Sequence, residues 1–190
     1  MMTHRRNLRR NSKQDQWGFS LIEVLISMFV LTTGLLSLAA VVGMAMSTTQ
    51  SARQDMIAKQ LANEAMESIF AARDSAQLQW TSINNVSNGG IFMDNAQSIN
   101  LAGGDGIIGT ADDSPAQVLN EPGRDGIVGT SDDVTLQLTS FKRTIAITPV
   151  LLAGQTSSTL RQLTITISYS TPQIVVPKTY VLSSYISQYH

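Results

Sequence analysis

Residues 18–46 read GFSLIEVLISMFVLTTGLLSLAAVVGMAM, and this stretch decides how the chain is organised. From Val24 to Met46 it holds 23 residues without a charge, and the next charged residue is Arg53. At about 1.5 Å rise per residue, a helix of that length covers the ~30 Å hydrocarbon core of a bilayer. The segment contains no proline, so we expect an unbroken membrane-spanning helix.

The charge of the chain is segregated along its length. The 190 residues carry a formal net charge of −1, yet residues 1–18 carry five basic residues against Asp15, a net +4, which leaves −5 on the remainder. A basic end before an apolar span is retained on the cytoplasmic side of a membrane. An acidic body argues against nucleic-acid binding. The absence of cysteine excludes a disulfide framework, a thiolate metal site and a cysteine nucleophile.

Three interpretations compete for this N-terminal region. A cleaved secretory signal has an apolar core of about 7–15 residues, which is shorter than the one here. A plain single-pass anchor fits the length and the charge bias. It does not account for Glu23, because an ionisable group at the centre of a membrane helix costs about 2.5–3.5 kcal/mol, although an acid at the interface can simply cap the helix start.

The third interpretation treats Gly18-Phe19-Ser20-Leu21-Ile22-Glu23-Val24-Leu25 as one unit. This octet resembles the prepilin signature of type IV pilins and type II secretion pseudopilins. The resemblance implies that a prepilin peptidase cuts between Gly18 and Phe19, which releases a leader of residues 1–18. It further implies N-methylation of Phe19 and pairing of Glu23 with the α-amino group of a neighbouring subunit during assembly.

Further residues resemble one branch of this family. Thr33-Gly34-Leu35-Leu36-Ser37-Leu38-Ala39 and the helix that follows are similar to PilV-type minor pilins, the type IV pilus modification proteins. The resemblance implies a structural subunit in a pilus or at its tip that supports assembly or adhesion. Its implied partners are the prepilin peptidase, other pilin subunits and the inner-membrane assembly machinery. Its implied location is the inner membrane and then the pilus at the cell surface.

Two alternatives stay open beside the minor pilin. Minor pseudopilins of type II secretion share much of the same pattern. A calcium-dependent surface-binding module on an uncleaved anchor is the alternative from a different class.

The apolar span continues into an amphipathic helix. Ala58, Leu61, Ala62, Ala65, Met66 and Ile69 follow the spacing of one helical face. Asp55 and Lys59, four residues apart, can pair on the helix surface. We therefore predict a leader over residues 1–18, a transmembrane or filament-core helix over 19–52, an amphipathic helix over 53–75 and a globular head over 76–190.

The C-terminal third is rich in predicted strands. Residues 163–169 alternate between apolar or aromatic and hydroxyl side chains, which is typical of a half-buried strand. Residues 134–138, 141–149 and 180–186 predict three more strands. Pro177 confines residues 174–176 to a sheet edge or a bulge, and residues 154–158 predict a turn. Four strands against one face of a long helix make an α+β fold with an antiparallel sheet.

Residues 103–113 and 123–133 form an internal repeat that matches at 8 of 11 positions. The segment 103–133 carries a net charge of −6. Carboxylates on glycine-rich loops are ligands for hard divalent cations, so the repeat predicts two calcium loops, and the alternative is a pair of β-turns without metal. The candidate ligands are Asp105, Thr110, Asp112 and Asp113 in the first copy and Asp125, Thr130, Asp132 and Asp133 in the second.

The sequence does not favour an enzyme. His4 lies in the predicted leader and His190 is the last residue, so neither is placed to act as a general base. Nucleotide-binding fingerprints and a serine nucleophile elbow are absent. We expect a structural protein whose one candidate cofactor is calcium.

Overall fold

The structure is a computed structural model of the chain that describes residues 18–171 and 174–189. Contacts divide the chain into two units, Met1–Ser47 and Thr48–His190. Except for Gly18, the predicted leader lies outside the described residues.

One helix, α1 (Leu21–Asp74), supplies the α-helical part of both units among the described residues. Within the first unit every described side chain up to Met46 is exposed to solvent in the isolated chain. The apolar residues here include Phe29 at 70% and Leu36 at 71% exposure. Because such a surface is unfavourable in water, this segment requires a membrane or other helices around it.

In the second unit α1 buries one face in the core of the head. The buried positions are Ile57, Ala58, Leu61, Ala62, Ala65, Met66, Ile69 and Ala72. This confirms the predicted face and extends it by Ile57 and Ala72. Half of these residues are alanines, whose small side chains allow close packing of the helix on the elements that cover it.

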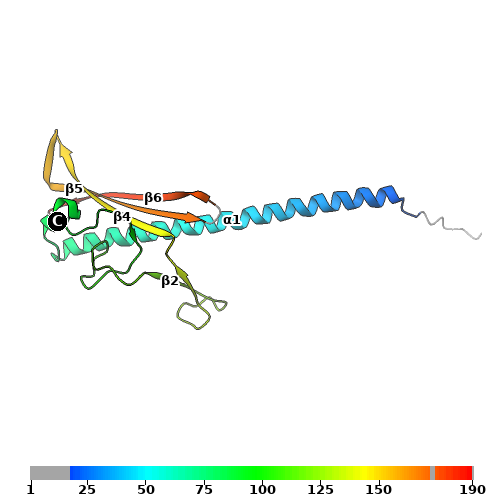
Figure 1. The fold of residues 1–190 in the computed structure, drawn as a ribbon, viewed down its shortest axis with the longest axis horizontal. Coiled ribbons are helices and arrows are strands. Elements are labelled where there is room, and N and C mark those ends of the chain that lie inside the picture. The colour runs from blue at the N-terminus through cyan, green and yellow to red at the C-terminus, as the bar shows by residue number, and fades with distance from the viewer. Residues whose placement is uncertain (1–17, 172–173, 190) are drawn as a thin grey trace, which may run out of the picture. The chain divides into compact units, whose positions relative to one another are not determined.

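The head is built on a four-stranded antiparallel sheet in the order β1-β4-β5-β6. Its strands are β1 (Gln97–Ser98), β4 (Phe141–Leu152), β5 (Gln155–Thr171) and β6 (Ile174–Ser187), and the three long ones lie side by side in Figure 1. Central register pairs join Ile145 to Ile165 and Ile165 to Leu182. Pro177 lies in β6, which is an edge strand, so of the two predicted places for it, an edge or a bulge, the structure has the edge.

Alternation along the strands builds the core. In β4 the buried positions are Phe141, Arg143, Ile145 and Ile147, and in β5 they are Leu163, Ile165, Ile167 and Tyr169. All of these residues except Arg143 join the buried face of α1 in one hydrophobic cluster. The predicted α+β fold, a long N-terminal helix packed on an antiparallel sheet, is confirmed.

One predicted strand belongs to a different sheet. Residues 134–138 were expected beside the other three strands, but β3 (Val134–Gln137) pairs with β2 (Val118–Glu121) in a separate two-stranded sheet. The reason is local: β2 and β3 flank the second Asp/Gly loop, and the loop brings them together as a hairpin. The place in the main sheet is taken by the two-residue strand β1.

Smaller corrections concern the connections. The turn predicted at residues 154–158 is tighter, since Ala153 and Gly154 adopt positive φ and β5 already begins at Gln155. Two 3-10 helices, Trp80–Ser82 and Val86–Asn88, lie in the long connection after α1.

Polar contacts tie α1 to the sheet at both ends of the head. The Tyr169 hydroxyl donates to Asp55 Oδ1 at 2.5 Å, and Lys178 Nζ lies 3.5 Å from the same oxygen. The predicted pair of Asp55 with Lys59 is therefore wrong, because tertiary partners take the carboxylate. At the other end Arg73 donates to the Ser187 carbonyl at 3.2 Å.

Candidate functional site

The predicted cleavage site lies just before the helix. Gly18 and Phe19 precede α1, and the Phe19 side chain is 81% exposed. The Ser20 carbonyl accepts the amides of Glu23 at 3.0 Å and Val24 at 3.2 Å, so the first helical turn closes behind this junction. The Gly18–Phe19 peptide bond is accordingly not held in helical hydrogen bonding.

Glu23 sits in the first turn of α1. A negative charge there is favoured by the unpaired amides at a helix N-terminus. Among the described residues no hydrogen bond or ion pair reaches its carboxylate. This acid is therefore placed at the start of the apolar segment with its charge available to an external partner.

The hydroxyl groups inside the apolar segment are satisfied by the helix itself. Ser27 donates to the Val24 carbonyl at 2.9 Å, and Ser37 donates to the Thr33 carbonyl at 2.8 Å. Thr32 and Thr33 donate in the same way to carbonyls of the preceding turn. Back-bonding of this kind removes the cost of placing these groups in hydrocarbon. In the described part of the chain α1 is the one helix long and apolar enough to cross a membrane, with a mean hydropathy of 2.3 in its most apolar window.

A second candidate site is the pair of Asp/Gly loops in the head. We call residues 103–113 the inner loop and residues 123–133 the outer loop. The structure brings the predicted ligands of each loop together in the same hydrogen-bond network. Three contacts define the inner network: Thr110 Oγ1 to Asp112 Oδ1 at 2.6 Å, Ile107 N to Asp105 Oδ1 at 2.8 Å, and Gly109 N to Asp113 Oδ2 at 2.8 Å.

The outer loop repeats this network with almost the same distances. The corresponding contacts are Thr130 Oγ1 to Asp132 Oδ1 at 2.7 Å, Ile127 N to Asp125 Oδ1 at 2.9 Å, and Gly129 N to Asp133 Oδ2 at 2.6 Å. Gly103 and Gly123 close the two loops alike, because a Cβ on either would collide with the carboxylate of Asp112 or Asp132. The sequence repeat is thus a structural repeat.

The electrostatics of the loops follow from these contacts. The hydrogen bond from the Thr110 hydroxyl lowers the pKa of Asp112. Desolvation opposes this shift, and the backbone amides of Asp105 and Gly104 lower the pKa further. Thr130 lowers the pKa of Asp132 in the same way. Among the described residues no three His, Cys, Asp or Glu side chains converge as a metal-binding group. The carboxylates accept N–H and O–H donors here, and calcium binding stays a prediction.

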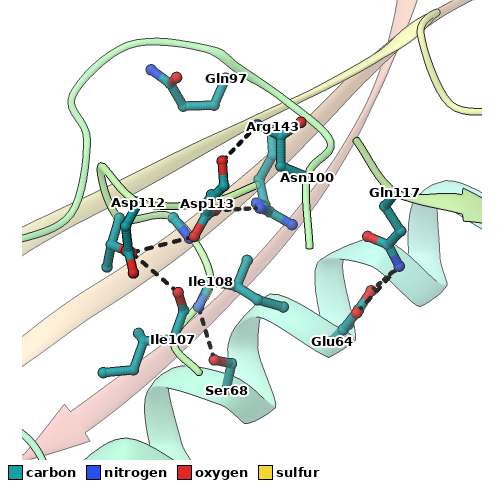
Figure 2. A network of polar contacts seen from close by, with 12 residues as sticks. Glu64, Ser68, Gln97, Asn100, Ile107, Ile108, Asp112, Asp113, Gln117 and Arg143 are labelled. Carbon is teal, nitrogen blue, oxygen red and sulfur yellow. Dashed lines mark hydrogen bonds and ion pairs between the residues drawn. The ribbon is translucent and has the colours of Figure 1, made fainter. Parts of the chain in front are cut away.

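Arg143 is a residue that the sequence analysis missed. It is 1% exposed and lies 3.3 Å from Asp113 Oδ2, which joins the inner loop to β4 (Figure 2). Burial lowers the pKa of Arg143, and the charges of Asp113 and Glu64 oppose that shift. The sequence does contain a signal for its burial. Arg143 lies between Phe141 and Ile145 in the alternation of the strand, at a position whose side chain faces the core.

Comparison with known proteins gives one match. The family model of the prokaryotic N-terminal methylation motif matches residues 15–39, which include the Gly18–Phe19 junction and Glu23. Neither the curated proteins nor the solved structures contain a significant match to this chain. The motif and the exposed apolar helix together support membrane anchoring. The chain thus carries, ahead of an α+β head, the type IV pilin-like prepilin signal.

Proposed function

We propose that this protein is a minor type IV pilin of the PilV type, a structural subunit that is cleaved after Gly18, methylated on Phe19 and assembled into a pilus or at its tip. The observation that supports this most directly is the methylation motif over residues 15–39, which coincides with a non-helical Gly-Phe junction and with the exposed apolar part of α1 up to Met46. The head would then support pilus assembly or adhesion.

The physical basis of the proposed assembly is that the apolar surface of α1 moves from the bilayer into another apolar environment, the fibre. In the precursor the exposed part of α1 lies in the bilayer, and in a fibre it packs against the helices of neighbouring subunits. Cleavage frees the α-amino group of Phe19, whose positive charge then forms an ion pair with the Glu23 carboxylate of an adjacent copy. Opposite charges about 4 Å apart attract by about 4 kcal/mol at an intermediate effective dielectric constant, which offsets part of their desolvation.

A type II secretion minor pseudopilin is the second candidate. The same motif favours it, because this N-terminal signal is shared by the two kinds of subunit. The chemistry assigned to Gly18, Phe19 and Glu23 is identical in both. The difference lies in the assembly that receives the subunit.

Mass spectrometry of the N-terminus tests processing. The chain is expressed with a prepilin peptidase, and the membrane fraction is compared with that of a Gly18→Val variant. We expect the unsubstituted chain to begin at Phe19 with one added methyl group and the variant to keep its leader. An unsubstituted chain that still begins at Met1 would contradict the proposal and favour an uncleaved anchor.

A fractionation experiment separates the two kinds of assembly. Pili are sheared from cells that express the chain, and the sheared fraction is probed for it. Co-purification with pili supports the minor pilin, whereas retention in cells with a secretion apparatus supports the pseudopilin.

A further inference from the structure

The two Asp/Gly loops have the same internal structure but opposite surroundings. In the inner loop Ile107 is 2% exposed and Ile108 is 5% exposed. Their counterparts in the outer loop, Ile127 and Val128, are 60% and 59% exposed. Because the hydrogen bonds within the loops agree closely, this difference does not come from different loop conformations. It comes from what lies against each loop.

The inner loop shows what such a loop binds. Its apolar pair enters the hydrophobic cluster, and its Gly109 lies so close to Ile145 that a Cβ there would collide with the Ile145 side chain. The amide of Ile108 donates to the Ser68 hydroxyl of α1 at 3.1 Å (Figure 2). Asp113, the last residue of the loop, pairs with the buried Arg143. The docking surface therefore combines an apolar pocket, a hydroxyl acceptor and a guanidinium.

The outer loop is presented on a supported hairpin. It connects β2 to β3, and β2 is linked to α1 by an ion pair of Glu121 with Arg53. Just before β2, Gln117 donates to both carboxylate oxygens of Glu64 at 3.2 and 3.3 Å. The exposed apolar pair is thus carried on an anchored element, which lowers the entropic cost of binding.

We propose that the outer loop docks into the head of a neighbouring subunit, in a pocket with the same chemistry as the one that holds the inner loop. That pocket has apolar walls for Ile127 and Val128, a hydroxyl that accepts the Val128 amide, and an arginine that pairs with Asp133. The net charge of −2 on residues 123–133 suits a basic partner. The inference rests on the proposed function, since it requires a fibre in which heads are adjacent.

Single-cysteine labelling tests the docking, because the natural chain contains no cysteine. Ile127→Cys is placed in the full chain, and Leu151→Cys is the matched control. Leu151 is 67% exposed at the end of β4, outside the repeat. Each chain is treated with a maleimide both in membranes before assembly and in sheared fibres. Thermal unfolding is compared with that of the unsubstituted chain to establish that both variants fold.

For Ile127→Cys we expect full labelling in membranes and a drop of about tenfold in fibres, since modification then requires release of the loop. For Leu151→Cys we expect equal labelling in both states. Equal labelling of Ile127→Cys in membranes and fibres would overturn the docking while leaving the proposed function intact. A chain that never reaches the fibre fraction would instead overturn the proposed function, and the docking with it.

A second pair of variants tests the partner's arginine. Asp133→Asn and Asp125→Asn remove the same charge from the same loop, but the inner-loop counterpart of Asp125 bonds only a backbone amide through its carboxylate. In the Ile127→Cys chain we expect Asp133→Asn to raise labelling in fibres several-fold and Asp125→Asn to leave it unchanged. An equal effect of the two substitutions would overturn the assigned pairing with arginine.

Discussion

Thr110 and Thr130 hold the same position in the two Asp/Gly loops and make the same bonds, yet Thr110 is buried and Thr130 is partly exposed. The Thr110 hydroxyl donates to Asp112 at 2.6 Å and Thr130 donates to Asp132 at 2.7 Å. A lost hydrogen bond costs more where water cannot replace the missing partner. Comparing substitutions of the two threonines therefore measures how burial of the inner loop against the head changes the contribution of one hydrogen bond.

We expect Thr110→Val to lower the free energy of unfolding by about 1–2 kcal/mol and Thr130→Val to change it by less than about 0.5 kcal/mol. The measurement is denaturant unfolding of the full chain in detergent, followed by the fluorescence of Trp80. Trp17→Phe is included in every chain, so that Trp80 is the one tryptophan present. Equal losses for the two variants would contradict the docked position of the inner loop.

Tyr169 links stability to alkaline pH. Burial and its hydrogen bond to Asp55 raise its pKa to about 12, from an ordinary value of 10.0. The folded state therefore holds the phenolic proton more tightly than the unfolded state. The resulting stabilisation is fully present below pH 10 and is lost as the pH rises toward 12.

The corresponding variant is Tyr169→Phe. We expect the free energy of unfolding of the natural chain to fall more steeply between pH 10 and 12 than that of the variant, measured by denaturant unfolding at fixed ionic strength. The difference between the two curves isolates the contribution of Tyr169, because every other titratable group is present in both chains. Parallel curves would contradict the Tyr169–Asp55 bond.

At the scale of the loop, two glycines separate packing from backbone strain. Gly109 and Gly129 have φ of +96° and +97°, which disfavours any residue with a Cβ. A Cβ at Gly109 would also collide with Ile145, whereas nothing lies within 4 Å of one at Gly129. We expect Gly129→Ala to cost about 1 kcal/mol of stability and Gly109→Ala about 2–4 kcal/mol, because only the second overpacks the core. Similar costs would show that the inner loop is not packed on β4.

Calcium binding by the loops is a prediction from the sequence that calorimetry decides. The full chain in detergent, freed of divalent ions, is titrated with calcium beside Asp112→Ala and Asp132→Ala. If the repeat holds calcium, each variant loses the heat of one site. If the hydrogen bonds from Thr110, Thr130 and the loop amides hold the carboxylates without a cation, no heat appears in any chain, and the prediction is wrong.

The elements that could be predicted from the sequence are those with a strong local period. The apolar run gave the first part of α1, the stripe from Ala58 to Ile69 gave its buried face, and the alternation in residues 163–169 gave β5. The methylation match over residues 15–39 agrees with the predicted prepilin signal. Each of these signals is contained within one element and depends on no distant partner.

What could not be predicted depends on partners far apart in the chain. Strand β1 has two residues and no period, and it exists because β4 offers an edge. The prediction placed β3 in the wrong sheet, because an alternating pattern predicts a strand but not the strand with which it pairs. Two loops that match at 8 of 11 positions carry no local sign that one is buried and the other exposed.

At the scale of the whole molecule, one helix serves two environments. The part of α1 in the head is fixed by buried alanines and by bonds to the sheet, whereas the side chains of the part up to Met46 lie exposed in the isolated chain. Its apolar surface determines insertion into a membrane, but apolar contact alone is tolerant of sliding. A charged residue at one point along the helix can fix the axial position of the subunit, which an apolar surface alone does not.

Glu23 supplies that charge in the proposed function, and its substitution is the test at this scale. We expect Glu23→Ala to insert, to be cleaved and to be methylated, yet to enter sheared fibres about tenfold less than the natural chain, because 1.4 kcal/mol of lost pairing already corresponds to that factor. Glu23→Gln keeps the shape without the charge and should fail equally, which separates ion pairing from packing. Glu67→Ala, at an exposed acid of the same helix within the head, is the control and should assemble normally. Normal incorporation of Glu23→Ala would show that apolar burial alone sets the position of the subunit.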